Sequence, residues 1–271
     1  MGDDRAGLRV APKPPPAVLA AFGLSGAPVP LAGGRGSSWR VGEAVLKPLD
    51  VSETELAWQG RILDSIVCDG FRVARSLRAR DGSLVVDGWC AWEAVGGRHE
   101  KGRWPEIIAV GERFHAALSG FERPGFIARR TNPWAVGDRV AWGELPADDF
   151  ADVKHLPRLV AALRPVAAPS QLVHTDLTGN VLFDDRLPPA VIDFSAQWRP
   201  TAYASAIVVA DALVWEGADE SLLDAVAHVE ELEQHLLRAL IFRAVVARLF
   251  GTEDDDAYLP AVELACRLAR Q

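Results

Sequence analysis

Cysteine, lysine and long hydrophobic runs are all scarce in this chain of 271 residues. Its three cysteines, Cys68, Cys90 and Cys266, are odd in number and widely spaced, which fits neither a disulfide framework nor a metal-ligand cluster. The longest apolar runs, such as 206–210, are too short to cross a bilayer, and the charged start MGDDRAGLRV has no apolar signal segment. We therefore expect a cytoplasmic protein with reduced thiols and no membrane partner.

Positive charge is also in deficit. Lysine and arginine together number 29 against 37 acidic residues, giving a net charge of −8 and a pI near 5.3. This balance argues against a nucleic acid as the main partner. Because the chain has only four lysines, Lys47 at the end of the apolar run 44–46 is conspicuous. Hydrophobic residues make up 49%, enough for a sizeable core in two domains or two lobes.

Most of the recognisable chemistry lies in residues 171–198, which read QLVHTDLTGNVLFDDRLPPAVIDFSAQW. Three apolar runs, 172–173, 181–183 and 190–192, predict strands, and the Asp- and Pro-rich stretch between the last two predicts a turn. This fold-back would bring Asp193 near Asp176 and Asn180. A carboxylate and an amide oxygen suit Mg²⁺. A second carboxylate can accept a hydroxyl proton, so the set is the inventory for phosphoryl transfer.

The order His174-x-Asp176, then Asn180, a hairpin and a strand ending in Asp193 resembles the catalytic core of the aminoglycoside phosphotransferase family, within the protein-kinase-like superfamily. The resemblance implies an α+β, bilobal protein-kinase-like fold. Residues 1–95 would form an N-lobe with a small antiparallel sheet and one helix, and residues 96–271 a mostly helical C-lobe. It also implies Asp176 as catalytic base, Asn180 and Asp193 as ligands of Mg²⁺, and ATP or GTP in the cleft between lobes, with a small hydroxyl-bearing substrate as the second partner.

The catalytic loop departs from the family pattern at one point. Asn180 follows Asp176 by four positions, one fewer than in the family. We expect Gly179 to compensate with a backbone dihedral that other residues rarely adopt. The shortened loop keeps open a nucleotide- or ligand-binding pseudoenzyme of the same fold. A polar turn in an unrelated α/β protein is the other alternative, while a protein kinase is disfavoured because no Ala-Pro-Glu-like segment follows Asp193.

The N-terminal part reads as strand 28–31, a Gly-rich turn, strand, second turn, and strand 44–46 ending at Lys47. Glycines let backbone N–H groups approach phosphate oxygens, and serine hydroxyls can donate to them. By the resemblance, Lys47 would contact the nucleotide phosphates under a cover formed by Gly34, Gly36, Ser37 and Ser38. The alternatives are a purely structural glycine turn and a surface lysine.

Residues 52–66 predict a helix with Ser52 as N-cap and Glu55 at the capping-box position. Glu55 would hold Lys47, or would serve only as a cap. Segments 71–80 and 84–94 predict antiparallel strands around the Asp81-Gly82 turn. The resemblance makes residues 92–95 the hinge whose backbone binds the adenine edge, with Trp92, Glu93 and Val95 at the nucleotide.

The rest of the chain predicts helices at 104–118, 153–163, 202–215, 220–250 with a possible break, and 257–269. His115 would be a buried core histidine and Asp211 a structural acid. Residues 121–145 show no clear periodicity, so we expect an insert there that could form a lid or a wall of the acceptor site. The acidic loop 251–256 is either solvated or a cation-binding element. Neither the acceptor nor the oligomeric state follows from the sequence.

Overall fold

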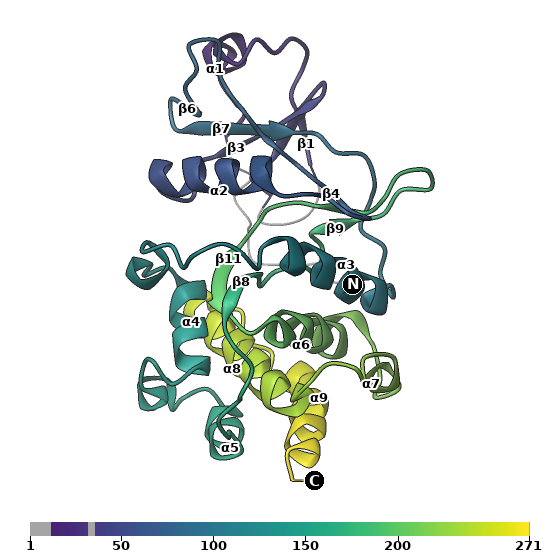
Figure 1. Cartoon of the computed structure of the whole chain (residues 1–271). Coiled ribbons are helices and arrows are strands. Elements are labelled where there is room, and N and C mark those ends of the chain that lie inside the picture. Colours follow the sequence, from purple (N-terminus) through teal and green to yellow (C-terminus); the bar gives the residue numbers. More distant parts are fainter. Residues whose placement is uncertain (1–11, 32–35, 271) are drawn as a thin grey trace, which may run out of the picture. The chain divides into compact units, whose positions relative to one another are not determined.

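The structure, a computed structural model, describes residues 12–31 and 36–270. The chain forms two compact units, which are traced along the sequence in Figure 1. The first contains Met1–His99 together with Gly179–Asp193, and the second contains Glu100–Thr178 and Phe194–Gln271. Strands dominate the first unit and helices the second, in keeping with the predicted α+β class. The predicted lobe boundary after residue 95 stays a prediction.

The first unit is built on a six-stranded antiparallel sheet of order β1-β2-β3-β7-β5, in which β6 also pairs with β7. Its core consists of apolar side chains from β2, β3 and β7 packed against Val18 of α1 and Phe22, which follows that helix. Burial alternates along β3, where Ala44 and Leu46 are buried and Val45 and Lys47 are less so, as the period of two of a strand requires. The elements of this unit are α1 (Pro16–Ala21), β1 (Val29–Pro30), β2 (Trp39–Val41), β3 (Ala44–Pro48), α2 (Glu53–Ser65), β4 (Arg72–Val73), β5 (Ser76–Leu77), β6 (Val85–Val86), β7 (Trp89–Glu93), β9 (Val181–Leu182) and β10 (Ala190–Val191).

The single strand predicted over 84–94 is wrong, because a turn divides it into β6 and β7. Asp87 and Gly88 at this turn have φ of 49° and 75°. Positive φ at both central residues is what a type I′ hairpin requires, and that turn matches the twist of the flanking strands. The strand predicted over 71–80 is likewise divided, since β4 leaves the main sheet while β5 pairs with β7.

A small second sheet of order β4-β10-β9 completes the first unit. Strand β10 pairs antiparallel with β9 and parallel with β4. The antiparallel pairing confirms that the chain folds back at the Asp- and Pro-rich turn between β9 and β10. Arg72 fastens the arrangement by donating to the carbonyls of Pro188 at 2.8 Å and Gly96 at 2.9 Å. Gly97 has φ of 121°, and a Cβ there would lie 2.8 Å from the Phe183 carbonyl, so only glycine fits.

The second unit is organised around α8, whose residues 234–247 are all buried. Helices α4, α6 and α9 pack against it, and β8 pairs antiparallel with β11 (Figure 1). No helix in the described ranges is long and apolar enough to cross a membrane. The elements are α3 (Trp104–Ala117), α4 (Pro133–Ala141), α5 (Leu156–Ala161), β8 (Gln171–His174), β11 (Ala196–Arg199), α6 (Thr201–Asp211), α7 (Leu222–Ala225), α8 (Leu232–Phe250) and α9 (Asp255–Leu268), with short 3-10 helices at Ile127–Arg129 and Ala147–Phe150 and a π-helical turn at Ala212–Glu216.

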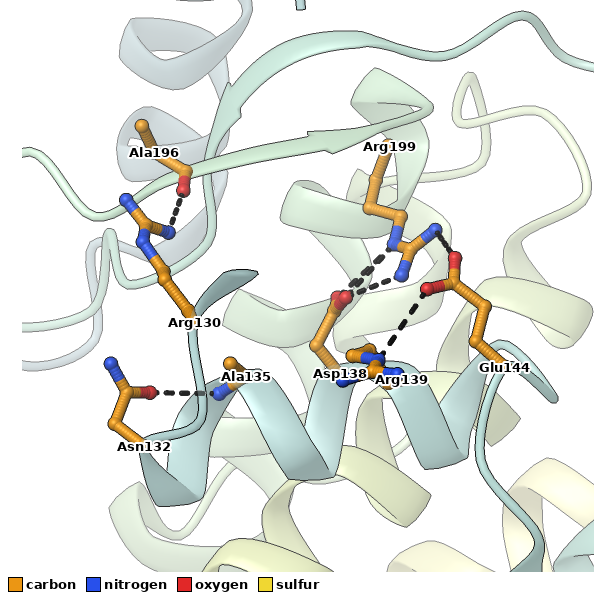
Figure 2. A network of polar contacts seen from close by, with 8 residues as sticks. All are labelled: Arg130, Asn132, Ala135, Asp138, Arg139, Glu144, Ala196 and Arg199. Atoms are coloured by element: carbon orange, nitrogen blue, oxygen red, sulfur yellow. Dashed lines mark hydrogen bonds and ion pairs between the residues drawn. The ribbon is translucent and has the colours of Figure 1, made fainter. Parts of the chain in front are cut away.

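Helix α4 lies inside the segment that showed no periodicity in the sequence. Asn132 caps it by accepting the Ala135 N–H at 2.9 Å, and Pro133 occupies the first helical position (Figure 2). Gly137 lets α4 approach α8 closely, because a Cβ there would lie 2.9 Å from the Phe242 carbonyl. The insert is therefore a packed part of the second unit.

Candidate active site

Lys47 and Asp193 form an ion pair in the first unit, although 146 positions separate them in the sequence. The Lys47 Nζ lies 2.6 Å from Asp193 Oδ1 and 3.7 Å from Asp50 Oδ2. Burial opposes the charged ammonium, but the two carboxylates outweigh it, and the pKa of Lys47 is raised above its ordinary value. Lys47 is therefore a permanent cation held at the end of β10.

Asn180 and Asp193 are brought together by the ladder between β9 and β10. The Ile192 N–H donates to the Asn180 carbonyl at 3.0 Å, and Asp193 follows Ile192 directly. Asp193 has φ of 50°, a left-handed conformation that costs energy for a residue with a side chain. Its side chain is 57% exposed, so its carboxylate is accessible to a ligand.

This pair fits a nucleotide-bound Mg²⁺ better than a protein-enclosed metal. No cluster of three or more His, Cys, Asp or Glu side chains able to hold a metal ion occurs among the described residues. Mg²⁺ in nucleotide sites takes one or two carboxylates and fills its other positions with phosphate oxygens and water. The exposed Asp193 carboxylate, with Asn180 on the neighbouring strand end, matches that requirement.

The residues predicted to cover the phosphates are only partly described. Gly34 lies outside the described residues, and Gly36 has the left-handed φ of 66°. Ser37 and Ser38 are half-buried, and the Ser38 carbonyl accepts the Leu31 N–H at 2.9 Å, which joins the end of the turn to β1.

The predicted hinge follows the end of β7. Trp92 and Glu93 are the last residues of that strand, and the Ala94 N–H donates to the Glu43 carbonyl at 2.9 Å. Val95 comes next and is half-buried. The two N–H groups of Glu93 and Ala94 bond within the first unit, since the Glu93 N–H donates to the Arg75 carbonyl at 2.8 Å.

Glu55 is buried in the first turn of α2, where its N–H donates to the Ser52 Oγ at 3.2 Å. This confirms Ser52 as the N-cap of the helix. The pairing of Glu55 with Lys47 stays a prediction.

In the second unit, β8 ends at His174, the first residue of the catalytic-loop pattern. The His174 Nδ1 accepts N–H groups from Asp176 at 3.2 Å and Ser195 at 3.4 Å, so the ring fixes the loop backbone. The backbone N–H of His174 donates to the His115 Nε2 at 3.0 Å. His115 is a buried core residue, as predicted. Burial and the nearby His174 lower the pKa of His115 to about 3, so its ring is neutral.

Asp176 has a partner that the sequence did not suggest. The Arg243 Nη2, on α8, lies 3.0 Å from Asp176 Oδ1 and 2.6 Å from Asp211 Oδ2, while Arg243 Nε donates to Asp211 Oδ1 at 2.7 Å. Asp211 and Arg243 are buried. A bidentate pair of this kind is strong and fixed in geometry. The available signal was a lone arginine within the apolar run LIFRAVV.

The loop between Asp176 and Asn180 has the special backbone that its length predicted. Gly179 has φ of 80°, which confirms the expected unusual dihedral. Leu177 is buried, and a Cβ on Gly111 of α3 would lie 2.5 Å from its Cδ1. The missing side chain at Gly111 therefore leaves the space that the Leu177 side chain of the catalytic loop occupies.

Comparison with known proteins decides the family. Residues 29–240 match the phosphotransferase enzyme family, well over half of the chain. The chain belongs to this family. A comparison with curated proteins found no match.

The solved structures support the same assignment at the level of the fold. A microcompartment-associated aminopropanol kinase has a TM-score of 0.63 and 16% identity, covering 94% of this chain and 95% of that chain. A thermostable mutant of aminoglycoside phosphotransferase APH(4)-Ia, in a ternary complex with ADP and hygromycin B, has a TM-score of 0.58 and 16% identity over 94% of this chain and 97% of that chain. AMP-bound spectinomycin phosphotransferase APH(9)-Ia has a TM-score of 0.57 and 10% identity over 92% and 96%. The predicted family and kinase-like fold are confirmed.

Proposed function

We propose that this phosphotransferase moves the γ-phosphoryl group of ATP or GTP to a hydroxyl group of a small molecule, with Mg²⁺. The observation that carries the proposal is the Lys47–Asp193 pair, at 2.6 Å. It sets a fixed cation beside an exposed carboxylate, which suits a triphosphate bound together with its metal ion. The ADP and hygromycin B in the APH(4)-Ia complex, and the aminopropanol kinase, support a nucleotide and a small acceptor.

The first unit would hold the nucleotide. Lys47 would contact the phosphates under the backbone of Gly34 and Gly36 and the hydroxyls of Ser37 and Ser38, with Glu55 orienting the lysine. Trp92, Glu93 and Val95 would lie at the purine ring of the nucleotide. Asn180 and Asp193 would hold Mg²⁺, which when bound neutralises charge on the phosphates.

In the second unit, Asp176 would orient the acceptor hydroxyl and take its proton as the hydroxyl oxygen attacks the γ-phosphorus. One oxygen–phosphorus bond forms, the bond from the γ-phosphorus to the bridging oxygen breaks, and the nucleoside diphosphate leaves. Catalysis of this type depends on positioning and charge stabilisation rather than on covalent chemistry with the protein. The Arg243 pair would hold Asp176 in place for that role.

A pseudoenzyme that binds nucleotide without transferring phosphate is the second candidate. The shortened segment between Asp176 and Asn180 favours it, because one residue fewer constrains where the Asn180 side chain can reach.

Two measurements on the purified protein separate the candidates. A ligand that binds only the native state raises the melting temperature. At a concentration one hundred times its Kd, it adds about 2.7 kcal/mol to the free energy of unfolding. We expect Mg-ATP or Mg-GTP to do so. We then expect diphosphate release that depends on a hydroxyl compound from a broad panel, and Asp176→Asn to lose roughly 10²-fold or more of it while keeping the thermal shift. A shift without transfer across the panel would support the pseudoenzyme, and no shift would refute both.

A further inference from the structure

A cavity lies wholly within the second unit, between α4 and β11. Its volume is about 130 Å³, too small for a whole drug-sized ligand but sufficient for one small polar group. Its walls come from the insert that showed no periodicity in the sequence and from the strand that follows the metal-ligand segment. Figure 2 shows the polar network along it.

The floor of the cavity is a closed charge network around Arg199. Arg199 Nε lies 3.0 Å and 3.2 Å from the two carboxylate oxygens of Asp138, and its Nη1 lies 2.6 Å from Glu144 Oε1 (Figure 2). Asp138 and Arg199 are 3% and 8% exposed. Both carboxylates are therefore committed to Arg199, which leaves them little capacity to attract a cation.

Gln197 adds a neutral polar side chain to the cavity wall. It lies two residues before Arg199 on β11, so the two side chains share one face of the strand, and both line the cavity. Gln197 is only 7% exposed, and the surface that it keeps lies at the cavity. Its amide N–H₂ can donate to an oxygen of a group bound there.

Two further arginines line the cavity with donors to spare. Arg139 Nε is 3.9 Å from the nearest Glu144 oxygen, beyond hydrogen-bond distance, and Arg123 forms no ion pair with any described residue. Three guanidinium groups thus line a cavity with two carboxylates, and the excess charge is positive. The matching ligand group is an anion that can accept several N–H donors at once.

The cavity is also close to the proposed base along the chain. Gln197 is paired with Val173 in the β8–β11 ladder, and Asp176 lies three residues beyond Val173. Three residues span at most about 11 Å. The cavity and the proposed base therefore lie on neighbouring parts of the β8–β11 ladder and its loop.

We propose that this cavity binds the anionic group, a carboxylate or a phosphate, of the hydroxyl-bearing acceptor, through Arg123, Arg139 and the Gln197 amide. The identification of the bound anion as the acceptor rests on the proposed function, whereas the existence of an anion-binding site in the cavity does not. It selects hydroxy acids and phosphorylated alcohols over neutral and cationic alcohols of equal size.

The test uses four probes on one three-carbon skeleton. These are D-glycerate and glycerol 3-phosphate as anions, glycerol as the neutral compound, and 3-amino-1,2-propanediol as the cation. Binding to the full chain is measured by ligand-observed NMR without nucleotide, so the result does not depend on transfer. We expect at least one anion to bind ten-fold or more tightly than both controls. No preference for either anion, or a preference for the cation, would overturn the proposal.

Variants then locate the binding. Arg139→Gln and Arg123→Gln each remove a guanidinium charge, and Gln197→Leu removes the amide donor, so each should weaken binding of the anion by about ten-fold. Arg158→Gln, an exposed arginine on α5 away from the cavity, is the matched control and should bind as the parent does. Unchanged affinity in all three cavity variants, with melting temperatures like the parent's, would refute the site. Anion binding without transfer to any acceptor would support the cavity site and refute the proposed transferase function. Transfer to acceptors without any preference for anions would support the transferase function and refute the cavity site.

Discussion

Arg243 donates to Asp176 across 3.0 Å while the same guanidinium grips Asp211 with two hydrogen bonds. The residue proposed as the base is thus tied to a buried pair on α6 and α8. Burial disfavours the charged form of Arg243, but the two carboxylates outweigh it and raise its pKa above the ordinary value. Arg243 therefore acts as a fixed positive anchor for the catalytic loop at every pH at which the protein is folded.

Replacing Arg243 should separate positioning from stability. Arg243→Lys keeps the charge but loses the bidentate fork, so we expect kcat to fall by about ten-fold or more with nucleotide affinity unchanged. Arg243→Met leaves Asp211 as an unpaired buried carboxylate and should cost roughly 3–5 kcal/mol of unfolding free energy. Arg248→Lys, at an exposed arginine on the same helix, is the control, with an expected change of no more than about 0.5 kcal/mol. Equal kcat in Arg243→Lys and the parent would show that Arg243 does not position the base.

The Lys47–Asp193 pair predicts a division of labour in nucleotide binding. Lys47→Met should weaken ATP by roughly ten-fold or more, because a charge-assisted contact to phosphate is lost. Asp193→Ala should instead remove the dependence of binding on Mg²⁺. Calorimetric titration with and without Mg²⁺ measures both, with exposed Asp185→Ala as the control. Because the pKa of Lys47 is raised, ATP affinity should not change through loss of its charge between pH 7 and 9. Retained Mg²⁺ dependence in Asp193→Ala would remove Asp193 from the metal site.

Two buried histidines predict that the protein loses stability in acid. The pKa of His115 is lowered to about 3 by burial and by His174, and that of His235 to about 4 by burial and by Arg238, both from 6.5. The folded state therefore holds them neutral. Below pH 6.5 each histidine binds a proton in the unfolded state but not in the folded state. The free energy of unfolding is therefore unaffected by them above pH 6.5 and falls by about 1.4 kcal/mol per pH unit for each histidine below it.

His115→Gln tests this directly, because a glutamine oxygen can still accept the His174 N–H. Between pH 6 and 4 the slope of unfolding free energy against pH should be smaller by about 1.4 kcal/mol per unit than in the parent. His228→Gln, at an exposed histidine, should keep the parent's slope. Urea unfolding across this pH range gives the slopes, and identical slopes in the parent and His115→Gln would exclude a neutral buried imidazole.

Gly111→Ala probes the seat of the catalytic loop. The added methyl would lie 2.5 Å from Leu177 Cδ1, so either the side chain or the loop must shift. We expect kcat to fall by about ten-fold while the dissociation constant for Mg-ATP stays within two-fold of the parent's. Gly120→Ala, where a Cβ meets nothing within 4 Å, is the control. Unchanged kcat in Gly111→Ala would mean that Leu177 alone accommodates the methyl group.

Elements with strong local signals could be predicted from the sequence, and those fixed by distant packing could not. The α2 helix begins where its Ser52 cap predicted, and the β9–β10 hairpin was evident from its turn residues. Helix α4 was not predicted because it has only nine residues and because Gly137 and the charged Asp138 stand among its buried positions. Asp138 belongs there only because Arg199, on a strand far along the chain, neutralises it.

The same reason explains what was found and missed at the candidate site. Asp176, Asn180 and Asp193 stand in a compact local pattern, so the sequence indicated them together. The link from Lys47 to Asp193 and the link from Arg243 to Asp176 join segments that only the folded chain brings together. Charged partners carry no periodicity of their own, and their pairing cannot be read from spacing.

The hairpin of β9 and β10 has a consequence for how the protein is made. Strand β4 pairs in parallel with β10, and the side chain of Arg72, the first residue of β4, donates to the Pro188 carbonyl. A ribosome delivers residues 100–178 between these two halves. During synthesis the first unit must therefore wait, with an edge of β4 unpaired, until residue 193 has emerged, and a fragment ending at His99 would lack the hairpin that completes it.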